Sequence, residues 1–388
     1  MPFQRASRLD LLPPYLFIEI DRKKRAAIAA GKDVINLGVG DPDRPTFDFI
    51  VGRMAEAIRD PANHRYPHDV GVMEFREQCA AWFQRRFGVR LDPVSEVLTL
   101  IGSKEGIGHL PLAAVNPGDV VLVPEPGYPV YNASTIFAGG EPFVMPLKES
   151  NGWLPDFGAI PDSVLARTKL MFLNYPNNPL GAVATLEFLA QAVRLARKHD
   201  FIIAHDAAYS EVFFDRPPPS ILQVEGAKDV AVEMHSLSKT FNMTGWRLGF
   251  AVGHADVLAA LAKIKGNVDS GAFNAVQWAG AEAMRRIDGP EVAGMRELYR
   301  RRRDRFCAGL KAGGFRVTPP RATFYVWVRC PDGWDSVGCA TRILEEQAVV
   351  AIPGNGFGAS GEGYIRFSLT SPDDRVELAA ERLQGIRW

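Results

Sequence analysis

One lysine of the chain stands where it can act as a nucleophile. Lys239 lies in the segment HSLSKTFNMTGWRLGF, residues 235–250, between two strand-like runs and among small hydroxyl residues. An amine held in such a loop with a lowered pKa can form a Schiff base with an aldehyde. The segment therefore indicates covalent chemistry on an aldehyde cofactor, with Lys239 as the catalytic residue.

An acid and a phenol precede this lysine, at the end of another strand-like run. Asp206 ends the run FIIAHD, and Tyr209 follows it by three residues. A carboxylate in this place can keep a pyridine nitrogen protonated, so that the ring withdraws electrons, and a phenol can donate to a ring hydroxyl. These two side chains supply the ring contacts that a pyridine aldehyde needs.

A third group of residues is suited to a phosphate. Ser103 follows the apolar run VLTLI and opens a stretch compatible with a helix, whose free N–H groups would bind phosphate. Ser236, Ser238 and Arg247 add hydroxyl and guanidinium donors. Each signal alone is weak, because an SxxK sequence is commonly a solvated loop and a strand-end Asp is commonly a helix cap. Together they predict a site for pyridoxal 5'-phosphate.

The composition favours small-molecule substrates over polymers. Forty-five Lys and Arg residues balance 45 Asp and Glu residues in a chain of 388, so no uniform field attracts nucleic acid or anionic lipid. No apolar run reaches 18 residues, which argues against a membrane span, and charges and prolines interrupt the N-terminus, which argues against a signal peptide. We expect neither nucleic acid nor membrane partners.

Cysteine and histidine spacing gives no sign of a metal centre. The four cysteines form no CxxC pair, which fits scattered reduced thiols and a cytoplasmic location. His64 and His68 have the spacing of helical ligands, but Pro67 between them argues against a continuous helix. We expect no metal.

Short apolar runs alternate with amphipathic segments from about residue 53 to residue 253, which predicts an α/β fold with a mostly parallel sheet. Between the strand-like runs KLMFLNY and FIIAHD, apolar residues recur at helical spacing from Leu186 to Ala196, as in a crossover helix. Beyond about Asn274, long charged helices and the run TFYVWVRC indicate a smaller α+β domain. We expect an N-terminal arm and part of the small domain in 1–49, a large cofactor domain in 50–275 and the small domain in 276–388.

These motifs resemble the class I/II aminotransferases of the fold-type-I pyridoxal phosphate enzymes, over nearly the whole chain. SLSKTFNMTGWR resembles the lysine motif of that family, NYPNNPLG its asparagine turn, EPGYPVY its ring-stacking aromatic and YIRFSL its carboxylate-binding arginine. The resemblance implies transamination between amino and keto acids in a homodimer with shared sites. The residue patterns and this resemblance together give the expected cofactor contacts, which are Tyr66, Ser103, Lys104, Tyr128, Asn178, Asp206, Tyr209, Ser236, Ser238 and Arg247, and the expected substrate contacts, which are Tyr15, Gly40, Lys104, Asn178 and Arg366. Tyr66 is expected to reach the phosphate of the neighbouring subunit.

Within the family, PPYLFIEI, GSKEG and NMTGWR look most like the LL-diaminopimelate aminotransferases, in which counterparts of Tyr15 and Lys104 recognise the substrate. Tyr15 has an ordinary alternative as an aromatic staple of the N-terminal arm. Two features depart from the pattern. Leu180 replaces the usual threonine of the asparagine turn. In the plant-type diaminopimelate enzymes, a longer segment carries a glutamate of the partner chain that holds the distal ammonium of the substrate. The segment NHRYPHDVGVMEFRE is shorter and has no clear counterpart of that glutamate. Asp69 and Glu74 are candidates for it, or ordinary exposed charges.

The resemblance leaves several activities open. The preferred reading is transfer of an amino group between LL-2,6-diaminopimelate and 2-oxoglutarate. Aspartate, alanine, succinyl-diaminopimelate and aromatic amino acids are alternative substrates. A C–S lyase or decarboxylase on the same fold would use the same lysine, and an inactive binding protein would keep the fold alone.

Overall fold

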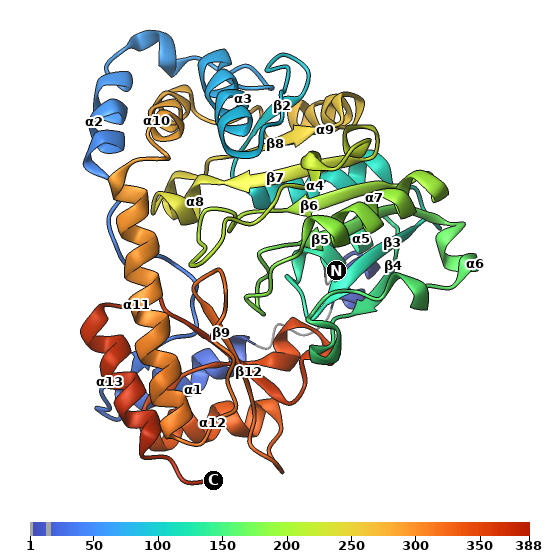
Figure 1. Ribbon diagram of the computed structural model, residues 1–388. Helices are drawn as coiled ribbons and strands as arrows, with labels where there is room; N and C mark the ends of the chain where they lie inside the picture. Colours follow the sequence, from blue (N-terminus) through green and yellow to red (C-terminus); the bar gives the residue numbers. More distant parts are fainter. Residues whose placement is uncertain (1–2, 13–16) are drawn as a thin grey trace.

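A seven-stranded sheet forms the centre of the computed structural model, which describes residues 3–12 and 17–388. The strand order is β2-β8-β7-β6-β5-β3-β4, and β8 alone runs antiparallel to the others in this sheet (Figure 1). The predicted mostly parallel sheet is confirmed. Its strands are β2 (Val97–Leu100), β3 (Val120–Glu125), β4 (Glu141–Pro146), β5 (Thr168–Asn174), β6 (Ile202–Asp206), β7 (Ala231–Ser236) and β8 (Gly249–Gly253).

Helices cover both faces of this sheet, as parallel strands require. One face packs against α4 (Ser103–Ala114), α5 (Val130–Phe137) and α9 (Ala255–Val268). The other face packs against α3 (Met73–Phe87) and α7 (Leu186–His199). Successive strand residues point to opposite faces, so side chains next to each other in the sequence pack on different faces of the sheet. The remaining helices of this part are α2 (Asp48–Ala57), α6 (Asp162–Leu165), α8 (Leu237–Thr240) and α10 (Asn274–Arg285).

Helix α7 is the predicted crossover between two parallel strands. The Thr185 hydroxyl caps its start by accepting from the Phe188 N–H at 3.2 Å. Leu189 and Val193 are buried on its inner face. The helix ends where Asp200 takes a left-handed conformation, with φ of 55°. This βαβ unit brings the ends of β5 and β6 to the same edge of the sheet.

A second hydrophobic core lies around a three-stranded antiparallel sheet of order β11-β12-β9. The N-terminal part of the chain returns to this core, because Lys23 Nζ donates to Thr341 Oγ1 at 2.9 Å and β1 pairs with β10. Helix α11 runs from the first core to the second (Figure 1). The elements here are α1 (Phe17–Ala29), β1 (Ile35–Asn36), α11 (Pro290–Ala312), β9 (Tyr325–Arg329), α12 (Ser336–Gln347), β10 (Val349–Val350), β11 (Ile352–Pro353), β12 (Tyr364–Ser368) and α13 (Asp373–Gln384).

The chain passes from the first core to the second within α11, which lies after residue 276, where the sequence predicted the small domain to begin. Helix α10 packs against α2 and α3, and buried side chains as far as Val292 join the core of the large sheet. Met295 and the residues after it join the second core. The three-part division of the chain stays a prediction about domains. Within residues 3–12 and 17–388, no helix is long and apolar enough to cross a membrane.

Candidate active site

A cavity of about 690 Å³ lies where β5, β6 and β7 end. Ligands bind at this edge of open α/β sheets, because the loops that follow the strands converge there. Residues of the second core, among them Tyr325 and Phe357, complete the wall. The predicted site residues that line the cavity are Gly40, Ser103, Lys104, Tyr128, Asn178, Asp206, Tyr209, Ser236, Ser238, Lys239, Arg247 and Arg366.

The amine of Lys239 lies inside this cavity, on the short helix α8 that follows β7. Its Nζ donates to the Gly40 carbonyl at 2.8 Å. Burial lowers the pKa of Lys239 to about 8, an effect that Asp41 opposes and that Arg247 reinforces. A lowered pKa makes the neutral, nucleophilic amine available near neutral pH. Lys239 therefore has the environment that its proposed role requires.

We expect capture of pyridoxal phosphate by the apoprotein to accelerate with pH and to level off above about pH 8. Only the neutral amine attacks an aldehyde, and below its pKa each pH unit lowers the neutral fraction about tenfold. Stopped-flow absorbance between about pH 6 and about pH 9 measures this profile. A Lys239→Ala chain supplies the background, and a flat profile would contradict the lowered pKa.

Asp206 faces the cavity at the end of β6, held by two donors. The Tyr131 hydroxyl donates to Oδ2 at 2.7 Å, and the Ala208 N–H donates to Oδ1 at 3.2 Å. Burial raises the pKa of Asp206 above its ordinary value, and these hydrogen bonds and the nearby His205 and His235 oppose that rise without cancelling it. The donors thus stabilise the anionic form, which could pair with a protonated ring nitrogen.

Arg366 lies in the cavity between two aromatic rings. Its guanidinium carbon is 4.3 Å from the ring centroid of Tyr325 and 4.7 Å from that of Phe357. Nη1 donates to Asn178 Oδ1 at 2.9 Å, and Nη2 donates to the Gly38 carbonyl at 2.6 Å. Nε is buried and has no hydrogen-bond partner in the described structure. This buried cation, with an unused donor, is suited to a carboxylate ligand.

The start of α4 and Arg247 together form an anion cradle. The first N–H groups of an α-helix have no partner within the helix and point at ligands. Gly102, just before α4, has φ of 75°, and a Cβ there would lie 2.4 Å from Arg247 Nη2. Glycine thus leaves room for the guanidinium beside the helix start. Ser236, whose Oγ accepts from the Ser238 N–H at 3.2 Å, lines the same cavity.

The cavity therefore fits a group that carries an aldehyde, a basic ring nitrogen and a phosphate. An amine of lowered pKa, a buried carboxylate and a helix-start cradle line one space, together with an arginine suited to a carboxylate substrate.

Comparison with known proteins agrees with this chemistry. The family model for aminotransferases of class I and II matches residues 32–383. The chain belongs to this family. It is an enzyme, an aminotransferase, with the fold-type-I architecture.

Curated and solved relatives match over nearly their full lengths. The LL-diaminopimelate aminotransferase of Syntrophobacter fumaroxidans is 55% identical over 389 residues, which is 100% of both chains. That of Aquifex aeolicus is 52% identical, with 99% of this chain and 100% of the relative covered. Substrate-bound BacF from Bacillus subtilis superposes with a TM-score of 0.93 at 38% identity, covering 99% of this chain and 98% of the other.

Among the described residues, one predicted site residue of the aminotransferase does not line the cavity. Tyr66 is 91% exposed in the single chain and lies outside the lining. Tyr15 lies outside the described residues, so its role stays a prediction. Lys104 does line the cavity, on the first turn of α4, with its side chain exposed.

The sequence reasoning missed three residues that shape the site. Tyr131 binds Asp206, Phe357 packs on Arg366, and the Tyr325 hydroxyl lies 3.0 Å from that of Tyr209. Tyr128 precedes α5 and Tyr131 lies within it, so no regular spacing on one helix pointed to the first. Tyr325 and Phe357 come from loops and strands of the second core, and their approach depends on tertiary packing.

The carboxylates of a cluster of potential metal ligands beside α4 are already engaged in ion pairs. Glu105, His109 and Asp269 have ligand atoms within 4.8 Å of one another. The buried ammonium of Lys265 donates to Glu105 at 2.8 Å and to Asp269 at 3.1 Å. Glu105 also accepts from the Ile101 N–H at 3.0 Å. The ion pairs therefore anchor the start of α4, which carries the anion cradle.

Proposed function

We propose that this aminotransferase binds pyridoxal 5'-phosphate through Lys239 and transfers an amino group between LL-2,6-diaminopimelate and 2-oxoglutarate. The observation that carries the proposal is the meeting of Lys239, Asp206 and the α4 cradle in one cavity. The names of relatives that are 50 to 55% identical over nearly the whole chain support the substrate.

The cofactor supplies an aldehyde and an electron-withdrawing ring that makes the substrate Cα–H acidic. In the proposed reaction the Arg366 guanidinium binds the substrate α-carboxylate and so orients the Cα–H bond. Lys239 Nζ then removes the Cα proton as a general base. A base held in position accelerates such a proton transfer. The Asp206 carboxylate pairs with the ring N–H. Ser103, Ser236 and Arg247 hold the phosphate.

The experiment that tests the function is a panel of amino donors assayed with 2-oxoglutarate. We expect LL-diaminopimelate to give the highest kcat/KM, and aspartate, alanine, succinyl-diaminopimelate and aromatic amino acids to give lower values. A different best donor would refute the substrate. Turnover without a keto-acid acceptor would instead indicate lyase or decarboxylase activity.

Lys104 is the candidate for the distal carboxylate of the substrate. Diaminopimelate differs from alanine by a distal carbon that bears both an ammonium and a carboxylate, so its pocket needs a cation. Lys104 stands on the first turn of α4, where the helix dipole disfavours a positive charge. An anionic ligand in the cavity would account for a cation in that position.

We expect Lys104→Met to lower kcat/KM for LL-diaminopimelate at least about tenfold, which corresponds to roughly 1.4 kcal/mol of transition-state stabilisation. Steady-state kinetics with a monocarboxylic amino acid is the control and should change much less. Equal losses for both donors would show that Lys104 serves the cofactor or the fold.

We further propose a cytoplasmic homodimer in which Tyr66 reaches the phosphate of the other subunit, which would account for its exposure in one chain. If so, a Tyr66→Phe chain mixed with a Lys239→Ala chain should give hybrid dimers with one doubly damaged and one intact site. Activity recovered on mixing is the expected readout, and unrecovered activity in verified hybrids would argue against sharing.

A further inference from the structure

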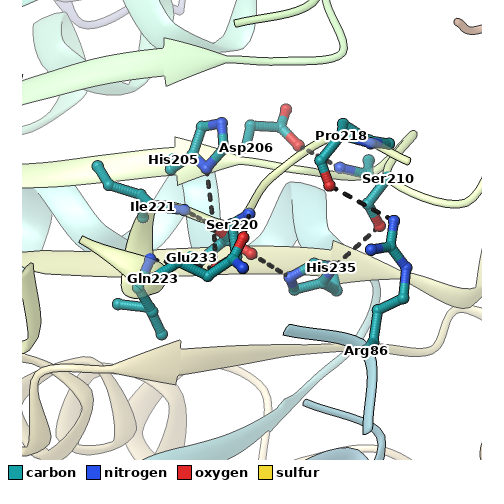
Figure 2. Close-up of polar contacts among 12 residues, drawn as sticks. Arg86, His205, Asp206, Ser210, Pro218, Ser220, Ile221, Gln223, Glu233 and His235 are labelled. Carbon is teal, nitrogen blue, oxygen red and sulfur yellow. Dashed lines mark hydrogen bonds and ion pairs between the residues drawn. The ribbon is translucent and has the colours of Figure 1, made fainter. Parts of the chain in front are cut away.

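A buried carboxylate lies in the large sheet near the strand ends that border the cavity, on the face of the sheet that packs against α3. Glu233, in β7, is fully buried, and its oxygens meet four hydrogen-bond partners (Figure 2). Oε2 accepts from His205 Nδ1, Ser220 Oγ and the Ile221 N–H, each at 2.9 Å, and Oε1 accepts from His235 Nε2 at 2.7 Å. Burial raises the pKa of Glu233, but the hydrogen bonds from the two histidines outweigh it and hold the pKa well below its usual range. The carboxylate is therefore an anion.

Each of the two histidines directly precedes a residue that lines the cavity. His205 precedes Asp206 at the end of β6, and His235 precedes Ser236 at the end of β7. His205 lies opposite Glu233 in the parallel pairing of these strands. Neighbouring strand residues point to opposite faces, so the imidazoles lie on the α3 side of the sheet and Asp206 lies on the cavity side. Glu233 thus links the ends of β6 and β7 on the face of the sheet opposite Asp206.

The ring of His235 is fixed in a single position. It stacks on Phe250 with centroids 5.0 Å apart, and the edges of Trp82 and Phe83 enclose it at 5.1 and 5.2 Å. Its second nitrogen, Nδ1, lies 3.3 Å from Ser210 Oγ. Figure 2 shows this ring between Ser210 and Glu233. Because the ring of His235 is held on all these sides, the backbone of β7 at this residue is held in place as well.

We propose that Glu233 is a positioning residue, which uses His205 and His235 to fix the backbone that presents Asp206 and Ser236 to the cofactor. A buried charge costs more than apolar packing of the same volume, so stability alone is a weak reason for a carboxylate here. A buried network in which the carboxylate is fully hydrogen-bonded does, however, fix one arrangement of the chain. The inference rests on the proposed cofactor site.

The test replaces Glu233 with glutamine, which keeps the shape but turns an NH₂ group toward at least one donor. We expect Glu233→Gln to raise the Kd for pyridoxal phosphate at least about tenfold. We also expect the pH midpoint of the bound cofactor's visible absorbance to shift by at least about half a unit, because Asp206 and Ser236 are displaced.

The matched control is Glu211→Gln. Glu211 is also buried, and its carboxylate pairs with Arg86 and Arg296 rather than with either histidine of the cluster. We expect this variant to unfold at a lower temperature while the cofactor Kd and the absorbance midpoint stay at the parent values. A Glu233→Gln chain that behaved in the same way would be merely destabilised, and the proposal would be wrong.

A second pair of variants decides the matter if Glu233→Gln does not fold. His205→Asn places an amide N–H where Nδ1 donates to Glu233, whereas His205→Ala removes the donor. We expect the alanine variant to weaken cofactor binding about tenfold and the asparagine variant to stay within about threefold of the parent. Equal losses would overturn the proposal. The parent is measured first, because a parent that does not bind pyridoxal phosphate would refute the proposed function itself.

Discussion

Replacing Lys239 with alanine is expected to abolish measurable transamination. The loss of general-base proton transfer alone costs roughly 10²- to 10⁴-fold in rate, and the loss of covalent cofactor attachment adds to it. The chain should still bind pyridoxal phosphate non-covalently, because the α4 cradle, Asp206 and Arg247 are untouched. Single-turnover kinetics on the reconstituted variant measures the first effect and equilibrium dialysis the second.

Two outcomes would contradict this expectation. Turnover within about tenfold of the parent, well short of the loss expected for a missing general base, would mean that another group removes the Cα proton. Complete loss of cofactor binding in a folded chain would mean that the cradle contributes little without the covalent bond. Circular dichroism of the apoprotein is the control for folding.

Replacing Arg366 with alanine is expected to weaken binding of every amino and keto acid alike. The α-carboxylate is common to all of them, and removing one partner of a buried charged pair costs about 2 to 5 kcal/mol. Dissociation constants for LL-diaminopimelate, alanine and 2-oxoglutarate measure the loss.

The cofactor serves as the internal control for this variant, because Arg366 takes no part in the phosphate cradle and is linked to an expected cofactor contact only through Asn178. Pyridoxal phosphate should therefore bind with nearly the parent affinity. If only one substrate lost affinity, Arg366 would be a specificity residue and its assignment to the α-carboxylate would be wrong.

Local signals predicted most of the large sheet and much of the site. Val120, Leu170 and Ile203 stand in apolar runs between helices, and these runs form neighbouring parallel strands. Asp206 was proposed because it ends a strand-like run and its carboxylate suits a ring nitrogen, and the structure places it on the cavity. Strand β4 was not predicted, since Pro142 and Pro146 interrupt it. Its position at the edge of the sheet tolerates both.

Contacts between distant segments were beyond sequence reasoning. The hydrogen bond from Arg366 to Asn178 joins residues 188 positions apart, and that from Tyr131 to Asp206 joins residues 75 apart. Nor does any periodicity show that His205 and His235 share the carboxylate of Glu233. These contacts depend on which strands become neighbours, and that order follows from packing of the whole sheet.

The central claim is that Lys239 carries the cofactor, and borohydride reduction followed by peptide mapping tests it most directly. Reduction of the holoenzyme fixes the linkage, and mass spectrometry then locates the labelled lysine. We expect a single pyridoxyl label on the peptide that contains Lys239. A label on Lys104 or another lysine, or no label at all, would contradict this account of the active site.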